Sequence, residues 1–198
     1  MARRLYALVF DGFEMLDLYG PLEMLQDVAE IALVAEGSEA VRASGGPRAL
    51  PETKLADINP GAEDILLIPG GPGTRALVDH PPLIEAIGRL SEMVGLSVTV
   101  CTGAALLART GHLDGRKATS NKRAFDWVRL QGPRVDWQPS ARWVEDGAFL
   151  TSSGVAAGMD MALALRARLT DRADAEARAQ RIEYRWVPDP NDDPFAVA

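Results

Sequence analysis

Short apolar runs alternate with segments of helical periodicity along the whole chain, and this alternation restricts the fold more than any other feature. Continuous apolar runs of this length predict strands that are buried on both faces of a sheet. The expected strands are Leu5–Phe10, Ile31–Ala35, Ile65–Ile68, Ser97–Val100 and Ala148–Thr151. Parallel strands need a covering helix at each crossover. We therefore predict an α/β fold with a mostly parallel sheet between helices, as one domain over residues 1–198.

The segments between the runs carry the signals for helices. The expected helices are Pro21–Leu25, Leu83–Met93, Ala104–Arg109, Val155–Leu169 and Asp171–Arg181. Pro21 is suited to the first position of a helix, which places Asp17 in the preceding loop. Asp160 lies near the start of its helix, where a carboxylate complements the helix dipole. The acidic, proline-rich tail Pro188–Pro194 is either an ordered strap or a loose end.

Composition and charge exclude several classes of protein. Hydrophobic residues make up 47% of the chain and charged residues 25%, which is the balance of a globular protein and not of a disordered one. The net charge of −7 argues against binding to nucleic acid or to an anionic membrane. No apolar stretch approaches the roughly 20 residues of a membrane span, and the N-terminal apolar run is too short for a secretory signal. We expect a cytoplasmic protein.

The single cysteine stands at a position with chemical meaning. Cys101 lies between the expected strand Ser97–Val100 and a helix that opens at Thr102 and Gly103. A strand-to-helix turn exposes a side chain at the carboxyl end of the sheet, where open α/β sheets bind ligands. The positive end of the helix favours a thiolate and predicts a lowered thiol pKa. From the spacing alone, an unreactive cysteine in the core is as well supported as a reactive one.

A second candidate element is the glycine-rich turn Pro69–Gly73, which follows an expected strand. The backbone N–H groups of Gly70 and Gly71 could point at a developing anion, although a plain tight turn explains the same residues. Gly103 leaves room for a sharp turn and for close approach of a substrate.

The two histidines are not expected beside the thiol. His112 follows Cys101 by a helix length of roughly 16 Å, and His80 precedes two prolines in an expected surface loop. With one cysteine and two histidines, a Cys-rich zinc site is excluded and no metal site is expected.

Taken together, the motifs resemble the ThiJ/PfpI superfamily, a class I glutamine amidotransferase-like group that includes deglycases and isocyanide hydratases. The matching segments are Val9–Phe13, Leu16–Pro21, Ile68–Gly71, Val100–Gly103 and Leu150–Asp160. They occur in the family's order over nearly the whole chain. The resemblance implies a flavodoxin-like sheet, a nucleophile elbow at Cys101 and a homodimer.

Within this superfamily, the residues beside the elbow look most like those of isocyanide hydratases. Family proteases have His where this chain has Thr102, and deglycases have Glu near the position of Asp17. Deglycases and isocyanide hydratases both tend to carry His where Asn121 stands here, so Asn121 departs from the pattern. The resemblance implies that Cys101 attacks an isocyanide as a thiolate while a protonated Asp17 acts as general acid. Water would then release an N-substituted formamide, with no cofactor and no metal.

The same resemblance implies supporting roles for Gly71 and Thr102, and it leaves other functions of the protein open. The backbone N–H groups of Gly71 and Thr102 would stabilise negative charge, and the Thr102 hydroxyl would steer Asp17 or water. The alternatives are a cofactor-independent glyoxalase or deglycase, and a non-enzymatic redox sensor in which Cys101 is oxidised. The ligand-sensing half of a transcriptional regulator carries little weight, because the chain has no basic DNA-reading segment.

Overall fold

The centre of the protein is a seven-stranded sheet with the strand order β10-β11-β7-β6-β1-β2-β5, as seen in a computed structural model that describes residues 3–197. Its strands are β1 (Arg4–Leu8), β2 (Glu30–Ala35), β5 (Thr53–Lys54), β6 (Ile65–Ile68), β7 (Leu96–Val100), β10 (Trp143–Asp146) and β11 (Phe149–Ser152). Every pairing is parallel except the antiparallel edge pair β10–β11. The prediction of a mostly parallel α/β sheet is confirmed.

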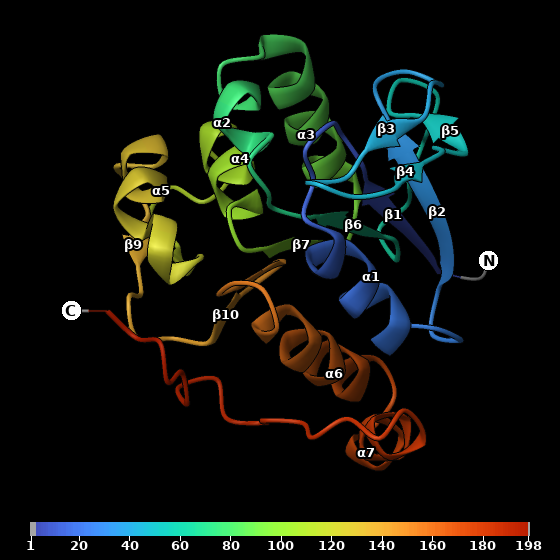
Figure 1. The fold of residues 1–198 in the computed structure, drawn as a ribbon, viewed down its shortest axis with the longest axis vertical. Coiled ribbons are helices and arrows are strands. Elements are labelled where there is room, and N and C mark those ends of the chain that lie inside the picture. The colour runs from blue at the N-terminus through green and yellow to red at the C-terminus, as the bar shows by residue number, and fades with distance from the viewer. Residues whose placement is uncertain (1–2, 198) are drawn as a thin grey trace.

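Helices cover both faces of this sheet (Figure 1). They are α1 (Met15–Met24), α2 (Thr74–Leu77), α3 (Pro81–Met93), α4 (Gly103–Arg109), α5 (Phe125–Gln131), α6 (Ala157–Leu169) and α7 (Arg172–Arg181), with a 3-10 turn η1 (Lys122–Ala124). Helices α1 and α6 lie on one face, and α3 and α4 on the other. None of the helices in residues 3–197 has the length and apolar character needed to cross a membrane.

Two small sheets lie beside the main one. Strands β3 (Val41–Arg42) and β4 (Arg48–Ala49) pair antiparallel, whereas β8 (Lys117–Ala118) and β9 (Asp136–Trp137) pair parallel. The central strands β6, β7 and β11 are buried at every position. The carboxyl ends of these strands are therefore held by a packed core, and they form the edge at which the candidate site lies.

The first helix begins earlier than the sequence predicts. It starts at Met15, so that Pro21 lies inside it and Asp17 stands in its first turn instead of in a loop. Six helical residues precede Pro21, so it removes one backbone N–H from the interior of the helix, and Leu25 N–H still donates to the Pro21 carbonyl at 3.0 Å. The neighbouring Gly20 permits a close crossing with α6, since a Cβ there would lie 2.8 Å from Met159 Cγ.

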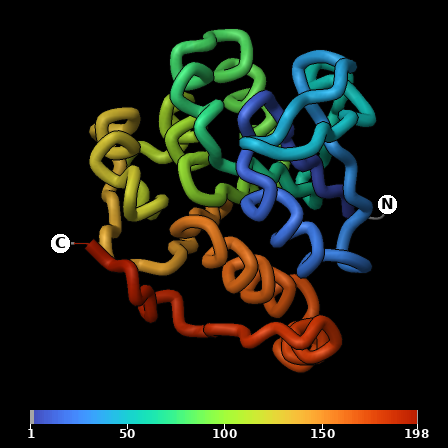
Figure 2. The backbone as a smooth tube through the Cα atoms, in the orientation of Figure 1, coloured from blue at the N-terminus to red at the C-terminus, as the bar shows by residue number. Residues whose placement is uncertain are grey.

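The C-terminal tail is an ordered strap and not a loose end. After α7, residues 184–197 run past α6 towards the chain that precedes β10 (Figure 2). Arg142 N–H donates to the Pro190 carbonyl at 2.7 Å, and Val197 N–H donates to the Pro139 carbonyl at 3.3 Å. These residues are called the C-terminal strap below.

Candidate active site

Cys101 occupies a strained turn between β7 and α4. Its φ of +56° lies in the left-handed region, which a side-chain-bearing residue adopts only when the surrounding structure holds it there. Its N–H is shared between the Ser152 and Ser153 carbonyls, at 3.2 and 3.3 Å. A Cβ on Gly103 would lie 2.3 Å from the Ile68 carbonyl oxygen, so the glycine allows α4 to start against the end of β6. The predicted strand-elbow-helix is confirmed.

The carboxyl group of Asp17 lies fully buried beside this elbow. Its Oδ2 accepts a hydrogen bond from Gly70 N–H at 3.0 Å, while its Oδ1 has no hydrogen-bond partner among residues 3–197. Burial raises the pKa of Asp17 to about 7, against the opposing effects of the Gly70 N–H and the Cys101 thiol. A buried polar atom without a partner is costly, and this one leaves a hydrogen-bonding position free for a substrate or a moving proton.

The Cys101 thiol is itself only 6% exposed. Burial is the main cause that raises its pKa, and the negative charge of Asp17 raises it further; hydrogen bonds from Thr102 N–H and Asn121 lower it. The expectation of a lowered thiol pKa is therefore wrong, because loss of hydration outweighs the helix terminus.

The order of ionisation within the pair follows from these shifts. As pH rises, the Asp17 carboxyl loses its proton before the Cys101 thiol does. When Asp17 and Cys101 together hold one proton, that proton is therefore on the sulfur and not on the carboxyl. This reverses the expected resting state of a thiolate beside a protonated Asp17.

Asn121 contributes a donor that the sequence did not reveal. Its Oδ1 accepts from Ala124 N–H at 3.1 Å and caps η1, which leaves the amide nitrogen for the thiol. A Cβ on Gly154 would lie 2.0 Å from Asn121 Nδ2 and 3.1 Å from Cys101 Sγ, so this glycine makes room for the contact. The sequence showed Asn121 only as a departure from the family pattern, and its distance from Cys101 along the chain hid the contact.

The glycine-rich turn packs tightly against the elbow. Gly71 has a φ of +127°, and a Cβ there would lie 2.3 Å from the Gly12 carbonyl oxygen. Gly71 N–H donates to Thr102 Oγ1 at 3.0 Å, and the same hydroxyl lies 3.0 Å from Thr74 Oγ1. A Cβ on Gly70 would lie within 2.8 Å of both Thr102 Oγ1 and Asp17 Oδ2. The role of Gly71 as an anion donor stays a prediction.

The remaining sequence candidates have structural contacts. His80 pairs with Glu36 at 2.9 Å on the surface, and His112 bonds to Thr110 just beyond α4. Asp160 is buried and accepts from Arg142 Nε at 2.8 Å and from Val187 N–H at 2.9 Å, so it anchors the strap. Within residues 3–197, no three His, Cys, Asp or Glu side chains gather where they could hold a metal ion.

The fold and this site define a class of protein: an α/β domain with a cysteine at a nucleophile elbow and a carboxyl group against the thiol. The chain belongs to the DJ-1/PfpI family, whose model matches residues 3–168.

Individual relatives span most of the chain. It is 29% identical over 192 residues to an isonitrile hydratase from Pseudomonas putida, covering 95% of this chain and 81% of the relative. A THiJ/PfpI family protein from Pseudomonas syringae has a similar crystal structure, with a TM-score of 0.85 and 29% identity over 95% of this chain and 77% of that one. A glutathione-independent glyoxalase from Caenorhabditis elegans is 29% identical over 82 residues, covering 41% of this chain and 44% of the relative.

Proposed function

We propose that this protein is an isocyanide hydratase-like enzyme that adds water to an isocyanide and releases an N-substituted formamide. The observation that carries the proposal is the buried Asp17 carboxyl, which has one oxygen unpartnered among residues 3–197 and lies against the chain's only thiol. The terminal carbon of an isocyanide has to accept a nucleophile and then a proton at the same atom. A thiol with a single proton carrier beside it supplies both.

The first half of the reaction starts from the pair that holds one proton. Asp17 takes the proton from Cys101 as the sulfur attacks the terminal carbon, and Asp17 then delivers that proton to the same carbon. A C–S bond forms, the carbon–nitrogen triple bond becomes a double bond, and the product is a covalent thioimidate. The donors at sulfur, Thr102 N–H and the Asn121 amide, stabilise the transient thiolate.

The second half uses water as the nucleophile. Asp17, ionised again, removes a proton from water as the oxygen adds to the thioimidate carbon, and this proton passes to the nitrogen. The hydroxyl proton of the adduct then returns to sulfur through Asp17 as the C–S bond breaks. An N-substituted formamide leaves, and the pair again holds one proton on Cys101.

The glycine-rich turn has a supporting role in the proposal. We assign Gly71 N–H to the negative charge that develops on the nitrogen as water adds to the thioimidate carbon. In this role, Gly71 N–H has to leave the Thr102 hydroxyl, to which it donates a hydrogen bond in the free protein. The Thr102 hydroxyl then keeps its neighbour Thr74 Oγ1, 3.0 Å away, as a hydrogen-bond partner. Gly70 and Gly103 supply the space that brings Asp17, Thr102 and α4 together.

Two observations count against the alternatives. The described contacts place His80 on Glu36 and His112 on Thr110, so the thiol has no histidine partner of the kind expected at a deglycase site. The raised pKa and slight exposure of Cys101 both slow reaction with peroxide, which argues against a redox sensor.

The test is steady-state turnover of a simple alkyl or aryl isocyanide by the purified protein, with the formamide product identified by mass spectrometry. We expect turnover whose kcat/KM rises with pH and levels off above about 7, as Asp17 loses its proton. Methylglyoxal is tested in parallel. Turnover of methylglyoxal without isocyanide hydration would reject the proposal in favour of a glyoxalase, and oxidation of Cys101 by mild peroxide with neither activity would favour the sensor.

Assembly and location also stay proposals. We propose a homodimer on the basis of the chain's membership of the DJ-1/PfpI family. Sedimentation would test this assembly. We also propose a cytoplasmic location, on the basis of the composition of the chain.

A further inference from the structure

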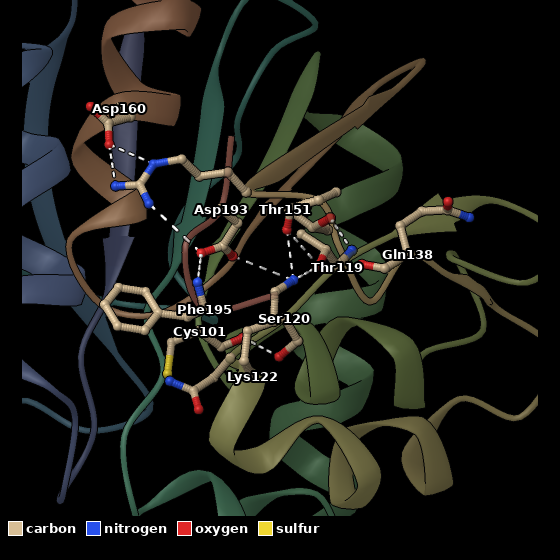
Figure 3. Close-up of polar contacts among 12 residues, drawn as sticks. Cys101, Thr119, Ser120, Lys122, Gln138, Thr151, Asp160, Asp193 and Phe195 are labelled. Atoms are coloured by element: carbon tan, nitrogen blue, oxygen red, sulfur yellow. Dashed lines mark hydrogen bonds and ion pairs between the residues drawn. The ribbon is translucent and has the colours of Figure 1, made fainter. Parts of the chain in front are cut away.

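The C-terminal strap brings a buried carboxylate close to the elbow. The side chain of Asp193 is 1% exposed; its Oδ2 lies 3.7 Å from Lys122 Nζ and its Oδ1 lies 3.9 Å from Arg142 Nη1. Arg142 is paired on its other side with Asp160 at 2.5 Å. Figure 3 shows this chain of charges from Asp160 to Lys122, with Cys101 close by. A carboxylate of the strap thus neutralises a cation in the segment that contacts the thiol.

Lys122 is held at its tip and lies next to Asn121 in the chain. Its side chain is only 4% exposed, and its Nζ donates to Thr119 Oγ1 at 2.7 Å and to the Ala141 carbonyl at 2.6 Å. Asp193 is the carboxylate that balances this charge. The ion pair therefore fixes the backbone on the C-terminal side of Asn121.

The other side of Asn121 is fixed just as firmly. Ser120 Oγ donates to the Cys101 carbonyl at 2.6 Å, and Thr119 N–H donates to Thr151 Oγ1 of β11 at 2.8 Å (Figure 3). Asn121 itself caps η1 through its Oδ1. Because Ser120 and Lys122 are both held and Asn121 Oδ1 is hydrogen-bonded, the side-chain amide nitrogen of Asn121 points towards the thiol.

We propose that Asp193 and Lys122 are positioning residues for the Cys101 thiol: their buried ion pair holds the Asn121 amide in place as a donor to sulfur. The inference rests on the proposed role of Cys101 as nucleophile. Without Asp193 the Lys122 ammonium is a buried charge without its counterion, which is strongly unfavourable. The lysine then moves or loses its proton, and the adjoining Asn121 moves with it.

The electrostatics of the cluster agree with this arrangement. Burial lowers the pKa of Lys122 to about 8, and Asp193 opposes that shift. The charged groups that surround the lysine are Asp193 from the strap and, beyond it, Arg142 with its partner Asp160. Removing the Asp193 charge deprives Lys122 of the group that keeps it protonated at neutral pH.

The test compares Asp193→Asn with Asp192→Asn, a matched loss of charge at an exposed neighbouring position. The readout is the second-order rate of alkylation by iodoacetamide at pH 8, which reports on the single cysteine and needs no isocyanide. We expect Asp193→Asn to lower the rate about threefold to tenfold, the effect of weakening one ordinary hydrogen bond to the sulfur, and Asp192→Asn to leave it unchanged. In the Asn121→Ala background, Asp193→Asn is expected to have no further effect.

Several outcomes would overturn the proposal. The first is an Asp193→Asn protein that has a lower melting temperature but an unchanged alkylation rate, and the second is a rate that rises because the strap merely shielded the thiol. The third is an equal change of rate in Asp193→Asn and Asp192→Asn. The fourth is additivity of Asp193→Asn and Asn121→Ala in the double-mutant cycle. If Asp193→Asn does not fold, Lys122→Met takes its place in the same cycle, because it removes the ammonium and keeps the apolar stem. If the wild type alkylates as expected but does not hydrate isocyanides, the proposed function fails while the positioning role is still tested.

Discussion

The two sides of the Cys101 thiol differ in how fully their polar groups are satisfied. On the carboxyl side, Asp17 accepts a hydrogen bond from Gly70 N–H through one oxygen, and its other oxygen has no partner in the described part of the chain. On the amide side, Asn121 Oδ1, Ser120 Oγ and Lys122 Nζ all have partners within 3.1 Å. The unpartnered oxygen lies on the fully buried Asp17 side, whereas Asn121 is only partly buried, so exposure to solvent does not account for the difference.

This difference separates reactive groups from positioning groups. A buried polar atom without a partner costs free energy, and such an atom persists where a substrate can supply the missing hydrogen bond. On the amide side, the hydrogen bonds of Asn121, Ser120 and Lys122 hold these residues in one geometry. The unpartnered oxygen on that side, Asp193 Oδ2, lies 3.7 Å from Lys122 Nζ and belongs to an ion pair behind Asn121. We therefore propose that the proton transfers take place on the Asp17 side and that the Asn121 side orients the sulfur.

The largest expected effect comes from removing the sulfur that both sides share. Cys101→Ala should abolish hydration of isocyanides, because no covalent intermediate can form. Folding should be retained, since the side chain lost is small and alanine meets the same backbone strain as cysteine at a φ of +56°. Circular dichroism and steady-state rates test this. A residual rate above a few per cent of the wild type would rule out covalent catalysis through sulfur.

Removing the proton carrier should come next in size. Asp17→Asn keeps the shape of the side chain and can still accept from Gly70 N–H, but it cannot carry a proton. Turnover should fall about 10²- to 10⁴-fold, the usual effect of losing a general acid or base, and the pH dependence of kcat/KM around 7 should disappear. Asp17→Glu serves as the conservative control and should keep part of the activity. Near-normal turnover by Asp17→Asn would remove Asp17 from the mechanism.

The same variant should be more stable than the wild type at neutral and alkaline pH. The folded-state pKa of Asp17 is about 7 against an ordinary value of 3.8, so the wild type loses stability as pH rises from about 4 to 7. The difference between the two free energies of unfolding should grow by about 1.4 kcal/mol per pH unit over that range, and stay constant above it. Urea denaturation at pH 5 and pH 8 measures this. A constant difference would mean that Asp17 ionises normally.

The amide side should give a smaller effect on turnover. Asn121→Ala removes one donor to the sulfur, and we expect kcat to fall about tenfold with KM unchanged. Asn121→Asp removes the same donor and adds a negative charge beside the thiol, so it should lower the rate of alkylation further. If Asn121→Ala matched the loss in Asp17→Asn, the separation between reactive and positioning sides would not hold.

The fold could be predicted from the sequence wherever local patterns decide the structure. The apolar runs predict the strands β2, β6, β7 and β11 to within one residue, because continuous burial leaves a pattern that short-range physics can read. The start of α1 could not be predicted in this way. Pro21 is typical of the beginning of a helix, and only the folded structure shows a helix that starts at Met15 and packs Gly20 against Met159.

The sequence by itself determined which residues are available for chemistry: one thiol at a strand-to-helix turn, Asp17 in a family motif, and glycines where the backbone packs closely. Only the tertiary structure decided how these groups behave. The pKa values of Asp17 and Cys101 rise because the folded chain removes both from water. The contacts of Asn121 and Asp193 join segments far apart in the chain. Desolvation and long-range contacts depend on which segments pack together, and no local pattern contains that information.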